Sequence, residues 1–183
     1  MPSERLDRED WVTAGLRALE RDGVGAVAVV PLARGLGVTR GSFYWHFASR
    51  EDLLAAVLER WEREHSTDVL DAVSAIPDPR ERLRAILERA VLKPATYFAR
   101  LLDAADGEPL VAATLARVAA ARLRVLERAY RQCGSTPAQA RRQALLAHAA
   151  YVGLARMPQD GEGSLGARER RALAAHAVAT FVP

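Results

Sequence analysis

The side chains best suited to chemistry are gathered in one short stretch of this 183-residue chain, GVTRGSFYWHFASREDLL, from Gly37 to Leu54. On a helix, the outer face of this stretch carries an arginine, a glycine and two aromatic residues. An arginine can pair bidentately with guanine, an aromatic edge can lie against thymine methyl groups, and a glycine lets backbone approach a duplex closely. We therefore expect a DNA-reading face that consists of Arg40, Gly41, Tyr44 and Trp45.

A second set of side chains is suited to the DNA backbone rather than to the bases. Hydroxyl, imidazole and guanidinium groups can donate hydrogen bonds to phosphate, and Arg50 lies where the amide groups of a helix start can also hold a phosphate. Other roles are open, because His46 could cap a helix and Arg40 could be a solvated charge. The two aromatic residues could instead pack partly against the first helix. The phosphate-binding set is Thr39, Ser42, the Tyr44 hydroxyl, His46 and Arg50.

The charge pattern around this stretch agrees with a polyanionic partner. The formal net charge of +3 is too small to indicate one by itself. From Gly23 to Arg50, however, there is no acidic residue, whereas Arg34, Arg40 and Arg50 are present. Phosphates attract guanidinium groups and repel carboxylates, so this window is what a focused nucleic-acid contact needs. Chance spacing is the alternative.

The elements that must position these residues are two helices joined by a tight turn. Ala33 is small enough to let the second of the two helices approach, and Gly37 supplies the positive φ angle that a short reversal requires. Phe43 and Phe47 share the inner face of the second helix and anchor it. This spacing predicts a helix-turn-helix over about 28–47.

Helical spacing dominates the rest of the chain as well, and strand-like alternation is nearly absent. The sequence therefore predicts an all-α fold with about nine helices. Thr39 and Ser49 are expected to cap two of them with their side-chain oxygens. The helices are expected over about 8–21, 30–36, 39–47, 49–73, 79–92, 96–105, 109–133, 137–157 and 167–181.

The segment from Arg8 to Trp61 resembles the N-terminal domain of the tetracycline-repressor (TetR-type) transcriptional regulators. Its most specific part, from Gly37 to Leu54, follows the family's run of Gly-Val-Ser/Thr, a small residue, Tyr, His-Phe and Ser-Lys/Arg-Glu-x-Leu. The resemblance implies a ligand-responsive regulator, expected to be a repressor, that binds a pseudo-palindromic operator and is released by a small molecule. The chain departs from the family at three positions before the turn. These are Ala28, where a capping Thr or Ser is usual, and Val30 and Pro31, where a polar or basic residue often contacts DNA.

The resemblance also implies two domains, a DNA-binding domain over 1–62 and a ligand-binding and dimerisation domain over 63–183. The homodimer would form through the helices at about 137–156 and 167–181 and would hold two recognition helices about 34 Å apart, one DNA turn. Small-residue faces on these helices agree with close packing in a bundle, although an internal core without dimerisation would use them equally. The small residues are Ala140, Ala144, Ala147 and Ala150, followed by Ala172, Ala175 and Ala179.

A small-molecule effector site between the fifth and eighth helices is a further implication. Aromatic and apolar side chains with a few polar groups are what such sites use. His148 and Tyr151 are the polar handles of interest, and ordinary core packing is the alternative for every candidate. The candidates are Tyr97, Phe98, Leu101, Leu102, Val118, Leu123, Leu126, Tyr130, His148 and Tyr151.

Other classes of function find no support in the sequence. The chain has no Gly-rich phosphate loop, no nucleophile with a base in motif context and no paired-carboxylate motif, so we do not expect an enzyme. Its four histidines are far apart and its one cysteine is Cys133, so neither a metal site nor a cofactor is expected. The charged N-terminus and the absence of a long apolar run predict a cytoplasmic protein without membrane contact. The remaining alternative is a helical small-molecule sensor or interaction protein without DNA binding.

Overall fold

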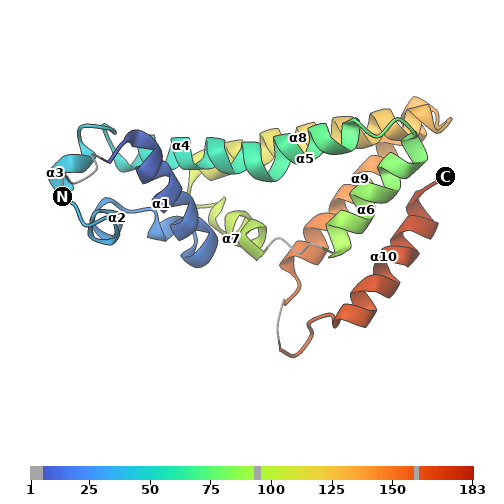
Figure 1. Ribbon diagram of the computed structural model, residues 1–183. Coiled ribbons are helices and arrows are strands. Elements are labelled where there is room, and N and C mark those ends of the chain that lie inside the picture. Colours follow the sequence, from blue (N-terminus) through green and yellow to red (C-terminus); the bar gives the residue numbers. More distant parts are fainter. Residues whose placement is uncertain (1–5, 93–95, 159–160) are drawn as a thin grey trace. The chain divides into compact units, whose positions relative to one another are not determined.

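The computed structural model describes residues 6–92, 96–158 and 161–183. These residues form helices and no strand, which confirms the all-α prediction (Figure 1). The chain divides into two compact units, one of Met1–His65 with Arg100–Leu115 and the other of Ser66–Ala99 with Ala116–Pro183. Each unit is therefore assembled from segments that are separated in the sequence.

The helices begin and end close to the predicted positions. Capping explains several of these boundaries, since Asp7 and Asp10 form a reciprocal capping box at the first helix and Thr136 and Gln139 form another near the C-terminus. In chain order the elements are α1 (Arg8–Asp22), the 3₁₀ helix η1 (Val24–Ala26), α2 (Val29–Gly35), α3 (Arg40–Phe43), α4 (Arg50–Glu62), the π-helical turn η2 (Arg63–Thr67), α5 (Asp68–Ser74), α6 (Pro79–Leu92), α7 (Thr96–Ala104), α8 (Pro109–Gln132), α9 (Pro137–Arg156) and α10 (Ala167–Phe181).

Two of the expected helices differ in detail. The helix expected over 39–47 is α-helical only in α3, and the amides of Tyr44, Trp45 and His46 then bond to carbonyls three residues earlier, as in a 3₁₀ turn. Thr39 occupies the N-cap position of α3, but its side chain makes no capping hydrogen bond, so that prediction was wrong. The helix expected over 49–73 is divided by η2, where the wider π turn accommodates one extra residue.

In the first unit, α1 packs against α4 over an apolar stripe. The crossing is close because Gly15 has no side chain: a Cβ at this position would lie 2.6 Å from Cγ2 of Val57. The Trp11 ring meets Phe43 edge to face with centroids 5.3 Å apart, and Phe43 stacks on Phe47 at 5.6 Å. This buried aromatic cluster confirms the predicted inner face and fixes α3 against the body of the unit.

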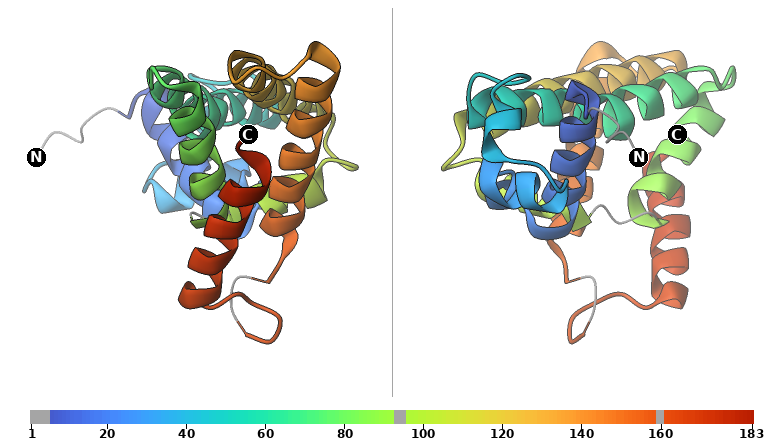
Figure 2. Two further views of the ribbon diagram at one scale, coloured as in Figure 1. Left: turned by 90° about the vertical axis from the view of Figure 1, so that its right-hand side faces the viewer. Right: turned by 60° about the vertical axis from the view of Figure 1, so that its left-hand side comes forward.

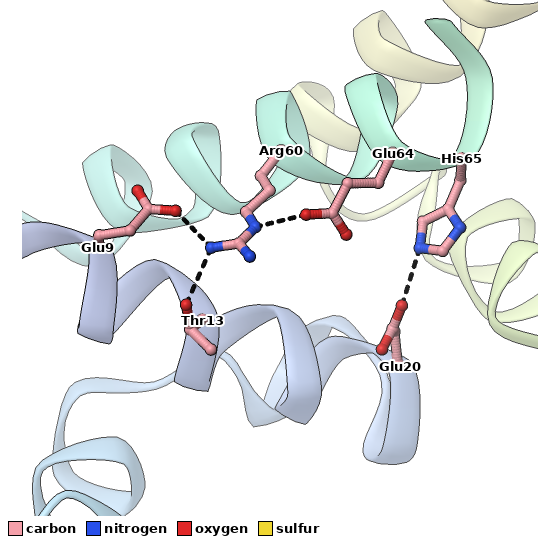
Figure 3. A network of polar contacts seen from close by, with 6 residues as sticks. All are labelled: Glu9, Thr13, Glu20, Arg60, Glu64 and His65. Carbon is pink, nitrogen blue, oxygen red and sulfur yellow. Dashed lines mark hydrogen bonds and ion pairs between the residues drawn. The ribbon is translucent and has the colours of Figure 1, made fainter. Parts of the chain in front are cut away.

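Polar contacts connect α1 to α4 and to the turn after it (Figure 3). The Arg60 guanidinium donates to Oγ1 of Thr13 at 2.9 Å and to a carboxylate oxygen of Glu64 at 2.6 Å, and it also binds the carboxylate of Glu9. Nε2 of His65, in η2, lies 2.8 Å from a carboxylate oxygen of Glu20. The hydrogen bond and charge of Glu64 raise the pKa of Arg60 above its ordinary value. The network therefore holds α1 to the α4–η2 segment at two separate points.

The core of the second unit is built from α6, α8 and α9, and α10 covers α6 (Figure 2). The small side chains Ala140, Ala144 and Ala147 of α9 face inward and lie in the core of the second unit rather than on an outer face. This corrects the assignment of these three alanines to a dimerisation face. Their small size serves close packing of α9 against α6 and α8. The core consists of Leu83, Leu87, Leu126, Ala129, Tyr130, Ala140, Ala144 and Ala147.

Candidate nucleic-acid interface and effector site

The expected DNA-reading side chains of α3 and the following turn lie on the surface of the first unit. The side chain of Trp45 is 84% exposed, so it does not pack against the core. The side chain of Tyr44 is 52% exposed and packs partly, because its ring meets that of Phe43 edge to face at 5.2 Å. Nη2 of Arg40 donates to the Tyr44 hydroxyl at 3.0 Å, and the guanidinium lies 5.8 Å from the Tyr44 ring centroid. One helical turn thus presents a guanidinium and two aromatic side chains together to solvent.

The glycines of this region have different tasks. Gly37 has a φ of +70°, which confirms that the turn between α2 and α3 uses a conformation that glycine adopts readily. Gly41 is exposed, and a Cβ added there would meet only Oγ1 of Thr39, at 3.6 Å. An alanine would therefore fit at Gly41 without disturbing the unit, so folding does not explain the glycine.

The residues expected to bind phosphate lie around this face, with one exception. Thr39 is exposed, and Ser42 and His46 are half-buried beside it. Arg50 is instead bound inside the unit: Nε donates to the Val27 carbonyl at 2.9 Å, and Nη2 donates to the Val24 carbonyl at 3.2 Å. The same Nη2 also forms an ion pair with Glu108 at 2.9 Å. Arg50 thus supports the η1 loop in this structure, and its contact with phosphate stays a prediction.

The structure also shows the three positions before the turn at which the sequence departs from the family pattern. Ala28 is the N-cap residue of α2 and offers no side-chain acceptor. Val30 and Pro31 are exposed on the first turn of α2. The apolar side chains on this turn cannot donate hydrogen bonds to phosphate.

The expected effector-site residues are divided between the two units. Leu101 and Leu102 belong to the first unit, whereas Phe98, Val118, Leu123, Leu126, Tyr130, His148 and Tyr151 belong to the second. Leu126 and Tyr130 are core residues, with Leu123 packed against them, so ordinary packing accounts for these three. The side chain of Tyr97 lies outside the described part of the chain.

Three of the second-unit candidates do lie together, around a residue that the sequence reasoning missed. The Phe98 and Tyr151 ring centroids are 5.3 Å apart, and His148 lies 6.4 Å from Tyr151. The guanidinium carbon of Arg122, on α8, is 5.0 Å from the Phe98 centroid and 4.8 Å from that of Tyr151. The pKa of His148 is lowered, first by burial and second by the Arg122 charge. The signal in the sequence was an arginine at an inward position of α8, one turn from the apolar Val118 and Leu126.

Two further residues of the first unit could not be found by motif. Glu108, just before α8, binds Arg50. Arg100, in α7, donates to the carbonyl of Glu20 at 2.8 Å and also to that of Arg21, and so satisfies the free carbonyl end of α1. Both contacts join segments that are far apart in the sequence, so no local sequence pattern predicts them.

In the part of the chain that the structure describes, no helix is both long enough and apolar enough to cross a membrane.

Comparison with known proteins gives a family match over the first unit. Residues 12–57 match the family of bacterial regulatory proteins described as the tetR family. The HTH-type transcriptional regulator AcrR of Shigella flexneri is 33% identical over 81 residues, which are 44% of this chain and 38% of that regulator. The chain therefore spans well under two thirds of the relative's length.

Solved structures share the fold over nearly the whole chain. The reduced form of NemR from E. coli superposes with a TM-score of 0.77 at 19% identity and covers 96% of this chain and 97% of its own. The structure of AibR in complex with isovaleryl coenzyme A and operator DNA has a TM-score of 0.65 at 18% identity and covers 98% and 99%. The chain thus carries, over residues 12–57, a domain of the tetR family of bacterial regulatory proteins, and it shares its fold with these solved structures.

Proposed function

We propose that the protein is a dimeric, ligand-responsive transcriptional repressor that reads a pseudo-palindromic operator with α3 and the turn that follows it. The observation that carries this proposal is the exposed group of Arg40, Tyr44 and Trp45 on one helical turn. Exposed aromatic side chains are unfavourable on a surface that meets only water, and in a major groove they contact thymine methyl groups beside an arginine that binds guanine. The absence of any acidic residue between Gly23 and Arg50 supports the same partner.

The role of Gly41 is the most specific part of this proposal. Since the unit leaves room for a methyl group there, the glycine is best explained by close approach of the α3 backbone to DNA. Thr39, Ser42 and His46 surround this point and would hold phosphates. The groove-facing set is then Arg40, Gly41, Tyr44 and Trp45.

The DNA-binding proposal is tested with duplexes selected from the host's genomic DNA, with affinity measured by fluorescence anisotropy. Replacement of Arg40 or Tyr44 by alanine should weaken binding by about tenfold or more, and Gly41→Ala should weaken it without lowering the melting temperature. Arg17→Ala, on the exposed face of α1, is the matched charge control and should leave the affinity within about twofold. If no genomic fragment is retained, the alternative of a helical sensor without DNA binding replaces this proposal.

Dimerisation would use outward residues of α9 and α10. Leu145 and Leu146 are 43% and 62% exposed, and Ala150 on the same helix is exposed beside them. On α10 the exposed small residues are Ala172, Ala175 and Ala179. Exposed leucines next to small residues are suited to pairing with a second copy in a four-helix bundle.

Sedimentation of a leucine variant tests the dimer. Leu146→Glu should shift the protein to monomers, because two charges would be desolvated in a symmetric interface. Leu92→Glu, at the exposed end of α6, is the matched control and should leave the mass unchanged. Equal dimer content in both variants would exclude this face.

Release by an effector completes the proposal. The segment α4–η2–α5 and the helix α8 each begin in the first unit and continue into the second, which supports transmission between them. Ligand and DNA would favour different conformers, and their effects on each other's affinity would be reciprocal. An effector that binds at saturation without changing operator affinity would refute this part.

A further inference from the structure

Arg122 occupies a position on α8 where the helical pattern calls for an apolar residue. Val118 and Leu126, one turn before and after it, are both buried. The Arg122 guanidinium lies over the rings of Phe98 and Tyr151, at 5.0 and 4.8 Å from their centroids. The positive charge is therefore directed into the second unit rather than toward solvent, where the chain's other arginines mostly lie.

The hydrogen-bond donors of the Arg122 guanidinium are only partly satisfied by its contacts with the two rings. Aromatic faces attract a cation, but they do not replace the acceptors that its in-plane N–H groups require. Nη1 of Arg122 is buried and has no hydrogen-bond partner in the described structure. A buried donor without an acceptor is unfavourable, and in a native protein it calls for an explanation.

The groups around Arg122 define what would satisfy it. His148 stacks beside Tyr151, and burial together with the Arg122 charge lowers its pKa, so the imidazole is neutral near pH 7. Tyr151 also lines a narrow hollow with Leu154, Met157 and Arg170, and the free space of about 10 Å³ there holds at most about one water. The surroundings of Arg122 are thus its own charge with one unsatisfied donor, two aromatic faces and a mainly apolar lining that also includes Arg170.

We propose that Arg122 binds the anionic group of the effector, and that the effector is a small carboxylate with an aromatic or aliphatic body. A planar guanidinium matches a carboxylate with two parallel hydrogen bonds, and one positive charge balances one carboxylate. Because the free space beside Tyr151 holds at most about one water, the rings of Phe98 and Tyr151 would have to move apart to contact the apolar body of the ligand. Neutral His148 would offer a further hydrogen bond. This assignment rests on the proposed effector function of the second unit.

The test uses matched pairs of probes on the full-length wild-type protein without DNA. Isothermal titration calorimetry compares benzoate with benzamide and hexanoate with hexanamide, because each pair differs in charge but hardly in shape. We expect the carboxylates to bind at least about tenfold more tightly than the amides, since a charge-assisted pair is lost in the amide. Equal affinity within each pair, or no carboxylate binding up to about 10 mM, would overturn the assignment. Tighter binding of inorganic phosphate than of any carboxylate would overturn the carboxylate class.

Substitutions of Arg122 test whether this residue is the one that binds the carboxylate. Arg122→Met keeps most of the side-chain volume and removes the unpartnered donor, so we expect an unchanged or higher melting temperature and loss of the carboxylate preference. Arg122→Lys should retain a weaker preference, and Arg124→Met, exposed on the same helix, should retain all of it. If Arg122→Met lowers the melting temperature and keeps the preference, Arg122 has a structural role only. Because these measurements contain no DNA, their failure is distinguishable from failure of the operator-binding proposal.

Discussion

The Arg50 guanidinium lies 2.9 Å from the Glu108 carboxylate, although the two residues are 58 positions apart in the sequence. The same guanidinium binds the carbonyls of Val24 and Val27. Arg50 therefore connects the η1 loop before the helix-turn-helix with the segment that opens α8. A basic residue at the start of α4 predicts a contact with phosphate. In this structure, Arg50 supports the η1 loop.

Replacement of Arg50 by alanine tests this support. The variant would leave two backbone carbonyls and a partly buried carboxylate without their donor, so the free energy of unfolding should fall by about 1–3 kcal/mol. Arg34→Ala removes an exposed arginine of α2 and should change it by less than about 0.5 kcal/mol. Urea denaturation measures both, and equal stabilities would restore Arg50 to the candidates for phosphate binding.

The turn between α2 and α3 gives a second prediction. Gly37→Ala forces a left-handed conformation on alanine and should destabilise the protein by about 1–2 kcal/mol. Gly35→Ala is the matched control, because Gly35 is helical, has no positive φ and has open space around it. The control should be neutral or stabilising by about 0.5–1 kcal/mol. The melting temperatures of the two variants separate the cost of the left-handed backbone at position 37 from the general effect of replacing a glycine by an alanine.

The crossing of α1 and α4 gives a third prediction, based on space rather than conformation. Gly15→Ala would bring a Cβ to 2.6 Å from Cγ2 of Val57, and the helices would have to separate. Overpacking of this kind should lower the free energy of unfolding by about 1–3 kcal/mol. Gly25→Ala places a methyl group in open space and should have an effect below about 0.5 kcal/mol. A stable Gly15→Ala protein would contradict the close crossing.

Tyr130 gives a prediction about alkaline pH. Burial, with a smaller contribution from Cys133, raises the pKa of Tyr130 from 10.0 to about 12. Between these two pH values the folded protein keeps a proton on Tyr130 that the unfolded chain releases. The contribution of the protonated Tyr130 to the free energy of unfolding is therefore complete below pH 10 and is lost as the pH rises toward 12. Over this pH range, the free energy of unfolding of Tyr130→Phe should therefore fall by roughly 1–3 kcal/mol less than that of the wild type.

The same variant has an expected outcome at neutral pH. The Tyr130 hydroxyl is buried and lacks a hydrogen-bond partner in the described residues, so its removal should be neutral or stabilising at pH 7. Urea denaturation at pH 7 and pH 11 provides the comparison. If Tyr130→Phe lost as much stability between pH 7 and pH 11 as the wild type does, the assignment of the alkaline loss to Tyr130 would be contradicted.

The helices and the recognition turn could be predicted because their determinants are local. The Asp7 cap, the Phe43 and Phe47 anchors and the Gly37 turn act within a few residues of themselves. The short length of α3 was not predicted, and the Thr39 hydroxyl, expected to cap the helix, makes no such bond. Hydrogen bonds three residues back then complete the turn.

Contacts between distant segments could not be predicted. Alanine suits a core and an interface equally, so the inward position of Ala144 and the outward position of Leu146 follow only from how α9 packs. The pairing of Arg50 with Glu108 likewise depends on the tertiary arrangement of the first unit. Arg122 was detectable as an interruption of an apolar stripe, but the rings it contacts come from two other helices.

The composition of the first unit bears on how such regulators can be recombined. A gene cut after the codon for Glu62 would encode α1–α4 without Arg100–Leu115, which the first unit includes. The encoded fragment would lack Arg100 at the end of α1 and Glu108 beside Arg50. A chimera that transfers the intact first unit to another protein must therefore carry two separate stretches of the gene.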